Sequence, residues 1–268
     1  MIKRLAIVFD SSGTLMRMYR VAKDTRTGEE LQNISSLRLV QESQALVAID
    51  ISPDKLPDYP PDQGLQCFIA ENDIDINIGC ASENITADDV RHVMQENNPG
   101  DVHVSDLLDV VSAVKKKCKN VFYIGTGFII DVPTGIVPYV ICTAGKLFSG
   151  AQEAVAQLMD CADLYIASGD SMRNLSMLAR HLDIPQENVV PVATPVVKER
   201  LIRNLKKTHG YVVMVGDEIN DLRAITAADF GVLTLQQHRD KSRKLRECAD
   251  IIIDDLSELP HIIRELEM

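Results

Sequence analysis

Short, uninterrupted apolar runs recur along the chain, and each is followed by small or acidic residues. These runs cover 5–9, 164–167, 211–215, 230–235 and 251–253. An apolar run without alternation predicts a strand that is buried on both faces, which is typical of a parallel sheet covered by helices. We therefore expect these segments to be strands of one parallel sheet.

Between these runs, apolar residues recur at the spacing of amphipathic helices. The predicted helices cover 151–159, 171–182, 196–207 and 221–228. Strands that alternate with helices are typical of a doubly wound α/β domain, in which ligands bind beyond the carboxyl ends of the strands. The predicted fold class is therefore α/β with a doubly wound parallel sheet, and acidic residues at its strand ends are candidates for chemistry.

The region 17–136 interrupts this alternation. It combines a Pro- and Asp-rich loop at 52–64, strands near 45–51 and 66–70, and helices near 86–97 and 104–118. Thr86 is the expected N-cap of the first helix. The glycines of YIGTGF at 123–128 favour an ordinary turn over a substrate contact. We expect an inserted α+β cap domain at 17–136 and a core domain built from 1–16 and 137–268.

Composition and charge narrow the function classes. The chain has 268 residues, 46% of them hydrophobic, and a formal net charge of -11. A chain this acidic, with no long basic stripe, gives little electrostatic support for binding nucleic acid. A small anionic ligand would need local help from a metal ion, a lysine or backbone amides.

Cysteines and hydropathy indicate the compartment. The six cysteines contain no CxxC pair and no Cys/His cluster at zinc spacing, so they are interpreted as core thiols in a reducing compartment. No apolar run reaches the length of a membrane span, and the run at 5–9 meets Asp10 too early for a signal peptide. We expect a cytoplasmic protein without a membrane partner.

Four short motifs that could form a functional site follow one another along the chain. Asp10 ends the first apolar run, Ser168-Gly169-Asp170 ends another, Lys198 opens a helix, and Asp217 follows a third run within VGDEIND. Singly, each has an ordinary explanation as a turn, a helix cap or a solvated lysine. Together and in this order they resemble the four motifs of the haloacid dehalogenase-like (HAD) superfamily, whose enzymes attack phosphoryl groups with an aspartate.

The resemblance gives these residues roles at a phosphoryl group. Asp10 would be the nucleophile that forms an aspartyl-phosphate. The turn after it would aim backbone amides at the phosphoryl oxygens, and Lys198 would offset the repulsion between carboxylate and phosphate. The residues expected to bind phosphate are Ser11, Gly13, Thr14, Ser168, Gly169 and Lys198.

The same resemblance implies a Mg²⁺ site. Asp10 and Asp217 would hold the ion, since Mg²⁺ takes oxygen ligands and keeps several waters. The resemblance adds the carbonyl of Ser12 as a third protein ligand. Asp221 would support the ligands or touch the metal through water.

Ser12 departs from the common phosphatase pattern. In HAD phosphatases the residue two places after the nucleophile is commonly an aspartate that acts as general acid and base, a function typically worth about 10² to 10⁴ in rate. The phosphorylation domains of P-type ATPases instead carry a threonine there, in a DKTGT motif. Three further stretches resemble those domains: SGDSMRNLSMLARHLDI, GDEINDLRAITAADFGV and CADIIIDDLSELPHII.

Other departures limit the comparison with ion pumps. Ser11 stands in place of the lysine of DKTGT, Glu218 replaces a glycine, and no KGAPE-like nucleotide motif is present. We therefore expect a soluble relative of the phosphorylation domain, with two functions open. The first is a Mg²⁺-dependent phosphohydrolase for a small phosphorylated substrate, slow or restricted to good leaving groups, in which Ser12 counts among the catalytic residues. The alternative is a catalytically weak module that binds or senses a phosphorylated ligand.

Overall fold

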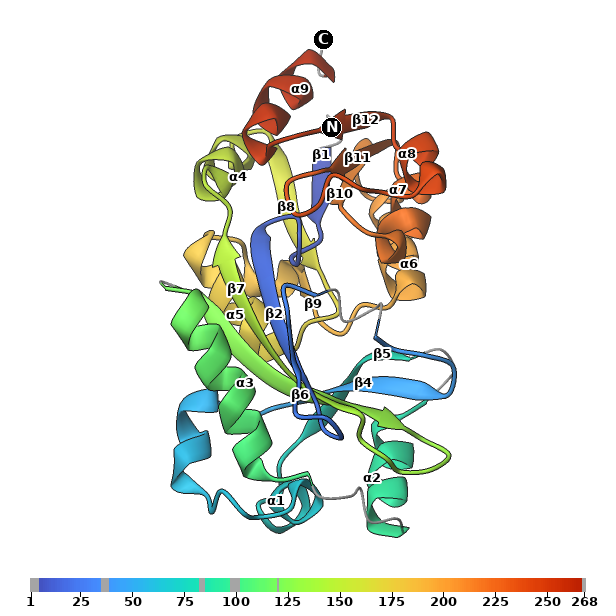
Figure 1. Cartoon of the computed structure of the whole chain (residues 1–268). Helices are drawn as coiled ribbons and strands as arrows, with labels where there is room; N and C mark the ends of the chain where they lie inside the picture. The colour runs from blue at the N-terminus through green and yellow to red at the C-terminus, as the bar shows by residue number, and fades with distance from the viewer. Residues whose placement is uncertain (1–4, 35–38, 82–84, 97–101, 120, 267–268) are drawn as a thin grey trace. The chain divides into compact units, whose positions relative to one another are not determined.

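The chain divides into two compact units. In the computed structural model the described residues are 5–34, 39–81, 85–96, 102–119 and 121–266. The core unit consists of Met1–Met18 and Lys146–Met268, and the inserted unit consists of Tyr19–Gly145. Figure 1 labels most helices and strands of both units, and each unit is described by itself.

The core unit is built on a parallel sheet, which confirms the predicted α/β class. Its strand order is β12-β11-β10-β1-β8-β9. The strands are β1 (Leu5–Phe9), β8 (Ala162–Ala167), β9 (Val189–Val190), β10 (Tyr211–Gly216), β11 (Phe230–Thr234) and β12 (Ile251–Ile253). The five predicted strands are all present, and β1 lies between β8 and β10.

Burial on both faces explains why the core strands are continuously apolar. Ala6 and Val8 of β1 belong to one hydrophobic cluster, together with residues of β10 and of the helices α6 (Pro195–Leu205) and α7 (Leu222–Ala227). Ile7 and Phe9 alternate with them and are equally inaccessible to solvent. Successive side chains of a strand point to opposite faces, so β1 is covered on both sides.

Helices flank this sheet. They are α4 (Ala151–Met159), α5 (Met172–His181), α6 (Pro195–Leu205), α7 (Leu222–Ala227), α8 (Arg243–Cys248) and α9 (Leu259–Leu266). Short 3-10 turns follow or precede them as η3 (Gln186–Asn188), η4 (Ile219–Asp221) and η5 (Leu256–Glu258). Figure 1 shows α4 and α9 on one side of the sheet and α6, α7 and α8 on the other. All four predicted helices are therefore present.

The inserted unit is built on a second sheet with the order β3-β2-β7-β6-β4-β5. Its strands are β2 (Met16–Asp24), β3 (Glu30–Gln32), β4 (Gln44–Ile49), β5 (Ile76–Ala81), β6 (Tyr123–Asp131) and β7 (Tyr139–Leu147). Its helices are η2 (Pro53–Asp58), α1 (Leu65–Glu71), α2 (Ala87–Glu96) and α3 (Val104–Lys117). Neighbouring pairs such as β4/β6 and β6/β7 are antiparallel. Residues between Val21 and Ala144 form a hydrophobic core of this unit's own.

The start of helix α2 in the inserted unit agrees with the N-cap predicted from the sequence. The hydroxyl of Thr86 accepts a hydrogen bond from the amide of Asp89 at 3.2 Å, and the Asp89 carboxylate accepts one from the amide of Thr86 at 2.8 Å. This reciprocal arrangement satisfies amides at the start of α2 that have no partner within the helix. The predicted N-cap is therefore confirmed.

Two expectations for the inserted unit are wrong. The segment 66–70, expected as a strand, lies in α1, where Leu65, Phe68 and Ile69 are buried at helical spacing. The segment 123–128, expected as a turn, lies in β6. Gly127 allows a close approach between strands, because a Cβ there would collide with the carbonyl oxygen of Val47.

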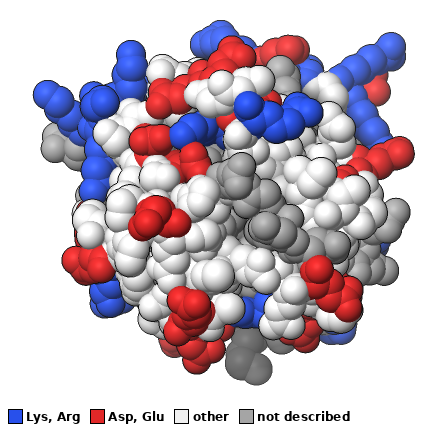
Figure 2. Space-filling view, turned by 60° about the horizontal axis from the view of Figure 1, so that its bottom comes forward, with Lys and Arg blue, Asp and Glu red and all other residues white. Residues whose placement is uncertain are grey.

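Charged side chains are dispersed on the face shown in Figure 2. Basic side chains are spread around the edge of that view, with acidic side chains between them. Within the described ranges, no helix has both the length and the apolar character needed to cross a bilayer.

Candidate active site

The register of the parallel sheet brings three strand ends to one level. Phe9 of β1 is paired with Val215 of β10 on one side and with Ile166 of β8 on the other. The chain leaves these strands at Asp10, Asp217 and Ser168, all of which are buried. The carboxyl edge of the sheet therefore gathers these three residues.

The turn after Asp10 depends on glycine. The amides of Leu15 and Met16 both donate to the carbonyl of Ser11, at 3.0 and 2.9 Å, so the chain turns back on itself at once. Gly13 has a φ of 88°, and a Cβ at this position would collide with the carboxylate of Asp217. Only glycine lets the turn lie against Asp217.

Lys198 is buried beside Asp10 because of how α6 begins. The Thr194 hydroxyl accepts a hydrogen bond from the amide of Val197 at 3.3 Å, and Pro195 opens the helix. Lys198 then shares the buried face of α6 with Ile202 and Leu205.

The ammonium group of Lys198 bridges two carboxylates. Its Nζ lies 2.6 Å from Asp10 Oδ1 and 2.6 Å from Asp221 Oδ1. The second oxygen of Asp221 accepts hydrogen bonds from the amides of Asp217 at 3.1 Å and Glu218 at 3.3 Å. Asp221 thus ties the loop after β10 to Lys198. A Cβ on Gly216 would come within 2.6 Å of the Asp221 side chain, so this packing also requires glycine.

Burial and mutual repulsion shift the protonation of the cluster. Burial raises the pKa of Asp10 well above its usual range, Lys198 opposes this shift, and Asp221 and Asp217 add to it. Burial opposes the charge on Lys198, but Asp10 and Asp221 outweigh it, so the pKa of Lys198 is raised. Burial raises the pKa of Asp217 to about 7 against the attraction of Lys241. Three buried carboxylates in one place therefore depend on the positive charge of their neighbours.

These carboxylates fit a divalent cation. Asp10, Asp217 and Asp221 can each offer one oxygen, and these oxygens lie within 4.8 Å of one another. Asp217 Oδ1 is buried and has no hydrogen-bond partner among the described residues. Oxygen ligands of this kind are those that Mg²⁺ prefers.

Hydroxyl groups from two strand ends meet at Asp170. Ser11 Oγ lies 2.6 Å from Asp170 Oδ2 and 2.8 Å from Ser168 Oγ, and Ser168 Oγ donates to the same carboxylate oxygen at 3.0 Å. The hydroxyl of Ser12 donates to it at 3.2 Å. Asp170 therefore organises three hydroxyls beside Asp10, a role that sequence reasoning missed although it had singled out Ser168-Gly169-Asp170.

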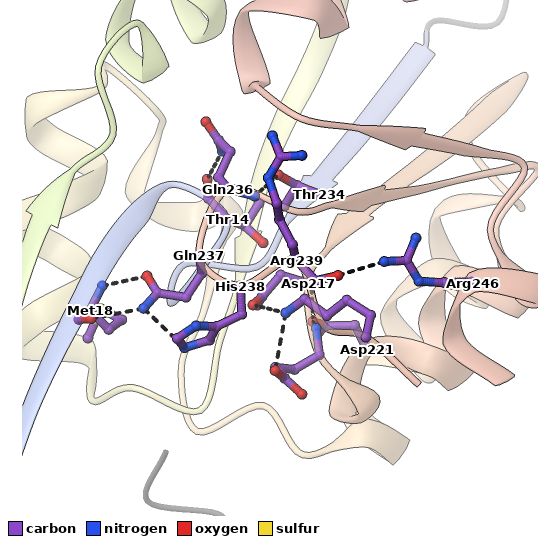
Figure 3. Close-up of polar contacts among 12 residues, drawn as sticks. Thr14, Met18, Asp217, Asp221, Thr234, Gln236, Gln237, His238, Arg239 and Arg246 are labelled. Atoms are coloured by element: carbon purple, nitrogen blue, oxygen red, sulfur yellow. Dashed lines mark hydrogen bonds and ion pairs between the residues drawn. The ribbon is translucent and has the colours of Figure 1, made fainter. Parts of the chain in front are cut away.

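Among the predicted phosphate-binding residues, Gly169 and Thr14 differ in their exposure to solvent. Gly169 is exposed at the end of β8. Thr14 is buried, its Oγ1 has no partner within the described part of the chain, and its carbonyl accepts a hydrogen bond from Gln236 Nε2 at 3.1 Å. Figure 3 shows Gln236 beside Thr14 and Gln237 beside Met18.

Lys241 is a member of the site that sequence reasoning missed. Its Nζ lies 2.9 Å from Asp217 Oδ2 and 3.1 Å from Glu218 Oε1. Only 1% of its side chain is exposed. It lies within a strongly polar stretch, HRDKSRK, so no local signal separates it from the solvated charges around it.

Comparisons with known proteins agree with this geometry. The family model of haloacid dehalogenase-like hydrolases matches residues 5–229. A protein of Methanocaldococcus jannaschii described as a soluble P-type ATPase-like phosphatase is 32% identical over 267 residues, which cover 98% of this chain and 94% of that protein. The mouse calcium-transporting ATPase type 2C member 1 is 31% identical over 157 residues, which are 53% of this chain and 17% of the transporter.

The solved structures that match include two transport ATPases. The catalytic domain of the CPx-ATPase CopB-B matches with a TM-score of 0.46 and 15% identity, over 97% of this chain and 89% of that one. A zinc-transporting PIB-type ATPase matches with a TM-score of 0.47 and 17% identity, over 98% of this chain and 40% of that one. The family match spans both motif-bearing parts of the core unit, and the chain belongs to the haloacid dehalogenase-like hydrolases.

Proposed function

We propose that the protein is a Mg²⁺-dependent phosphohydrolase that acts through an aspartyl-phosphate on Asp10. The observation that carries this proposal is the environment of Asp10: its carboxylate is buried at the end of the central strand, 2.6 Å from a fully buried lysine ammonium. A carboxylate that only caps a turn does not need a buried counterion. A carboxylate that must approach a phosphate dianion needs a counterion, because the positive charge offsets the repulsion between the two anions.

The chain's own groups divide the reaction into two steps. In the first, a carboxylate oxygen of Asp10 forms a bond to phosphorus, and the bond between phosphorus and the leaving-group oxygen breaks with its electron pair on that oxygen. In the second, water attacks the same phosphorus, the bond to Asp10 breaks, and the carboxylate is released with inorganic phosphate. Lys198 balances charge in both steps, and the hydroxyls of Ser11 and Ser168 lie 2.8 Å apart at the ends of the neighbouring strands β1 and β8.

Asp10 and Asp217 are the proposed metal ligands, with the Ser12 carbonyl as a third and Asp221 in support. Bound there, Mg²⁺ would neutralise charge on the phosphoryl oxygens and orient them. Phosphate contacts are assigned to the turn of Ser11, Gly13 and Thr14.

Ser12 restricts the substrates. A hydroxyl is a poor proton donor for a departing alkoxide, whereas acyl phosphates and nucleoside triphosphates release oxygens that need little protonation. We propose that turnover is slow on alkyl phosphate esters and faster on phosphates with good leaving groups. The description of the M. jannaschii relative as a phosphatase agrees with hydrolysis of a small phosphorylated substrate.

Acid-quench trapping tests the covalent step. The protein is mixed with Mg²⁺ and radiolabelled acetyl phosphate or ATP, stopped with acid, and examined for protein-bound, hydroxylamine-labile phosphate. The wild type should show label and Asp10→Asn none, because an amide does not attack phosphorus. Asp183→Asn is the matched control, since Asp183 is exposed and has a φ of 54° that asparagine tolerates.

A second function is favoured by Ser12 alone. Without a general acid and base the site can hold a phosphoryl group longer than it turns it over, which suits a module that binds or senses a phosphorylated ligand. If the wild type binds inorganic phosphate with Mg²⁺ but neither forms phosphoenzyme nor hydrolyses acetyl phosphate or ATP, this function replaces the first.

A further inference from the structure

Lys241 is buried against a proposed metal ligand, which is an unusual place for a lysine. It lies between β11 and α8, directly before Ser242, whose hydroxyl accepts the amide of Leu245 at 3.3 Å. Its ammonium contacts Asp217 and Glu218, and its side chain is only 1% exposed. Lysine is almost never fully buried unless it is paired, so these two carboxylates account for its position.

The loop that carries Lys241 is fixed to the turn after Asp10. Gln237 pairs with the backbone of Met18, donating to its carbonyl at 2.9 Å and accepting from its amide at 2.9 Å. Gln236 donates to the carbonyl of Thr14 and accepts from the amide of Leu256 at 3.1 Å. Figure 3 shows the contacts of Gln236 with Thr14 and of Gln237 with Met18, with Asp217 and Asp221 close to the same loop. Several hydrogen bonds therefore fix the segment that places Lys241 beside Asp217.

The two buried lysines, Lys198 and Lys241, form ion pairs with different carboxylates. Lys198 is shared by Asp10 and Asp221, so the counterion of Asp217 is Lys241. A divalent cation bound at Asp217 would lie next to this ammonium and be repelled by it. Glu218, whose side chain is 40% exposed, offers the ammonium a second partner at the edge of the site.

We infer that the ammonium group of Lys241 competes with the divalent cation for the carboxylate of Asp217. This competition keeps the affinity of the site for the metal low until a phosphoryl anion is present. This inference rests on the proposed function, because it concerns the metal of that same site. Three buried carboxylates and two buried ammonium groups nearly balance without metal. The added charge of Mg²⁺ is best accommodated when a phosphate dianion enters with it, and the two ligands then favour each other's binding.

Calorimetric titration with Mg²⁺, with and without inorganic phosphate, tests this inference. Without phosphate, Lys241→Met should bind Mg²⁺ at least about tenfold more tightly than the wild type, because one nearby positive charge is gone. Phosphate should increase Mg²⁺ affinity strongly in the wild type and less in Lys241→Met. Lys241→Arg should keep the behaviour of the wild type, since it keeps the charge.

The control is Lys244→Met, which removes an exposed lysine three residues further along and should leave Mg²⁺ affinity unchanged. Lys241→Gln gives a second neutral variant if the methionine variant is poorly folded by circular dichroism. Equal Mg²⁺ affinity in the wild type and a folded neutral variant, including undetectable binding by both, would overturn the inference. Phosphoenzyme trapping on Asp10 is read independently, so its failure would count against the proposed function instead.

Discussion

Lys198 Nζ and Asp10 Oδ1 lie 2.6 Å apart, and both side chains are buried. The two residues are far apart in the sequence, so this contact depends on the folded core unit. Removing one member of a buried ion pair leaves the other charge unpaired, which is typically more destabilising than the pair itself is stabilising.

Lys198→Met should therefore lower the free energy of unfolding by about 3–5 kcal/mol at neutral pH. Urea unfolding followed by circular dichroism gives the value. Mg²⁺ should restore part of the loss, because the ion supplies positive charge to the same carboxylates. Lys207→Met, which changes an exposed lysine just after α6, should shift stability by less than about 0.5 kcal/mol; a loss of similar size in both variants would contradict a special role for the buried pair.

Ser12→Asp should raise turnover of alkyl and aryl phosphate esters about tenfold or more, by adding a proton donor and base where the chain has a hydroxyl. The gain should be smaller for acetyl phosphate, whose leaving group needs little protonation. Steady-state rates across such a series measure both effects. Ser12→Asn is the matched control, because asparagine has nearly the shape of aspartate but cannot act as an acid. An equal gain from asparagine would show that the lack of a proton donor at Ser12 is not what limits turnover.

Mg²⁺ affinity should fall as the pH drops below about 7, the pKa to which burial raises Asp217. Below this value Asp217 is protonated, and the proton must leave before the carboxylate can bind the ion, so affinity should weaken by up to about tenfold per pH unit. Above it Asp217 should contribute no further pH dependence. Calorimetry over a series of pH values on both sides of the pKa measures this, and Asp217→Asn should bind weakly without the same pH dependence.

Gly13→Ala should destabilise the protein by about 2 kcal/mol or more, because it combines a left-handed backbone with a collision against Asp217. Gly28→Ala is the matched control: Gly28 has a φ of 74°, but a Cβ there meets nothing within 4 Å. It should cost only about 1 kcal/mol. Thermal unfolding of the two variants side by side separates backbone strain from the collision, and equal losses would remove the structural argument for Gly13.

Local pattern was enough to predict the elements that carry the proposed nucleophile. The apolar run before Asp10 needs no tertiary information to be recognised as a buried strand, and the same is true of the run before Asp217. Parallel pairing then places both strand ends at one edge of the sheet. The HAD motifs lie on these elements, which is why the family could be recognised from a few short stretches.

Other features depend on packing that sequence alone does not show. The apolar residues of 66–70 fit a strand or a helix by periodicity, and contacts such as the edge-on packing of Phe68 against Tyr59 at 4.9 Å accompany the helix. Lys241 lies in a charged stretch that predicts a solvated loop. Its burial follows from Gln236 and Gln237, whose partners are more than two hundred residues earlier in the chain.

The order of the strands has a consequence for how the protein is synthesised. β1 is made before both of its partners, since β8 and β10 begin only at Ala162 and Tyr211. The inserted unit is one continuous segment with its own core, so it can fold on the ribosome while β1 has neither partner. The strand that carries the proposed nucleophile therefore remains apolar and unpaired while the inserted unit is synthesised, and a chaperone that shields it at this stage would protect the nascent chain from aggregation.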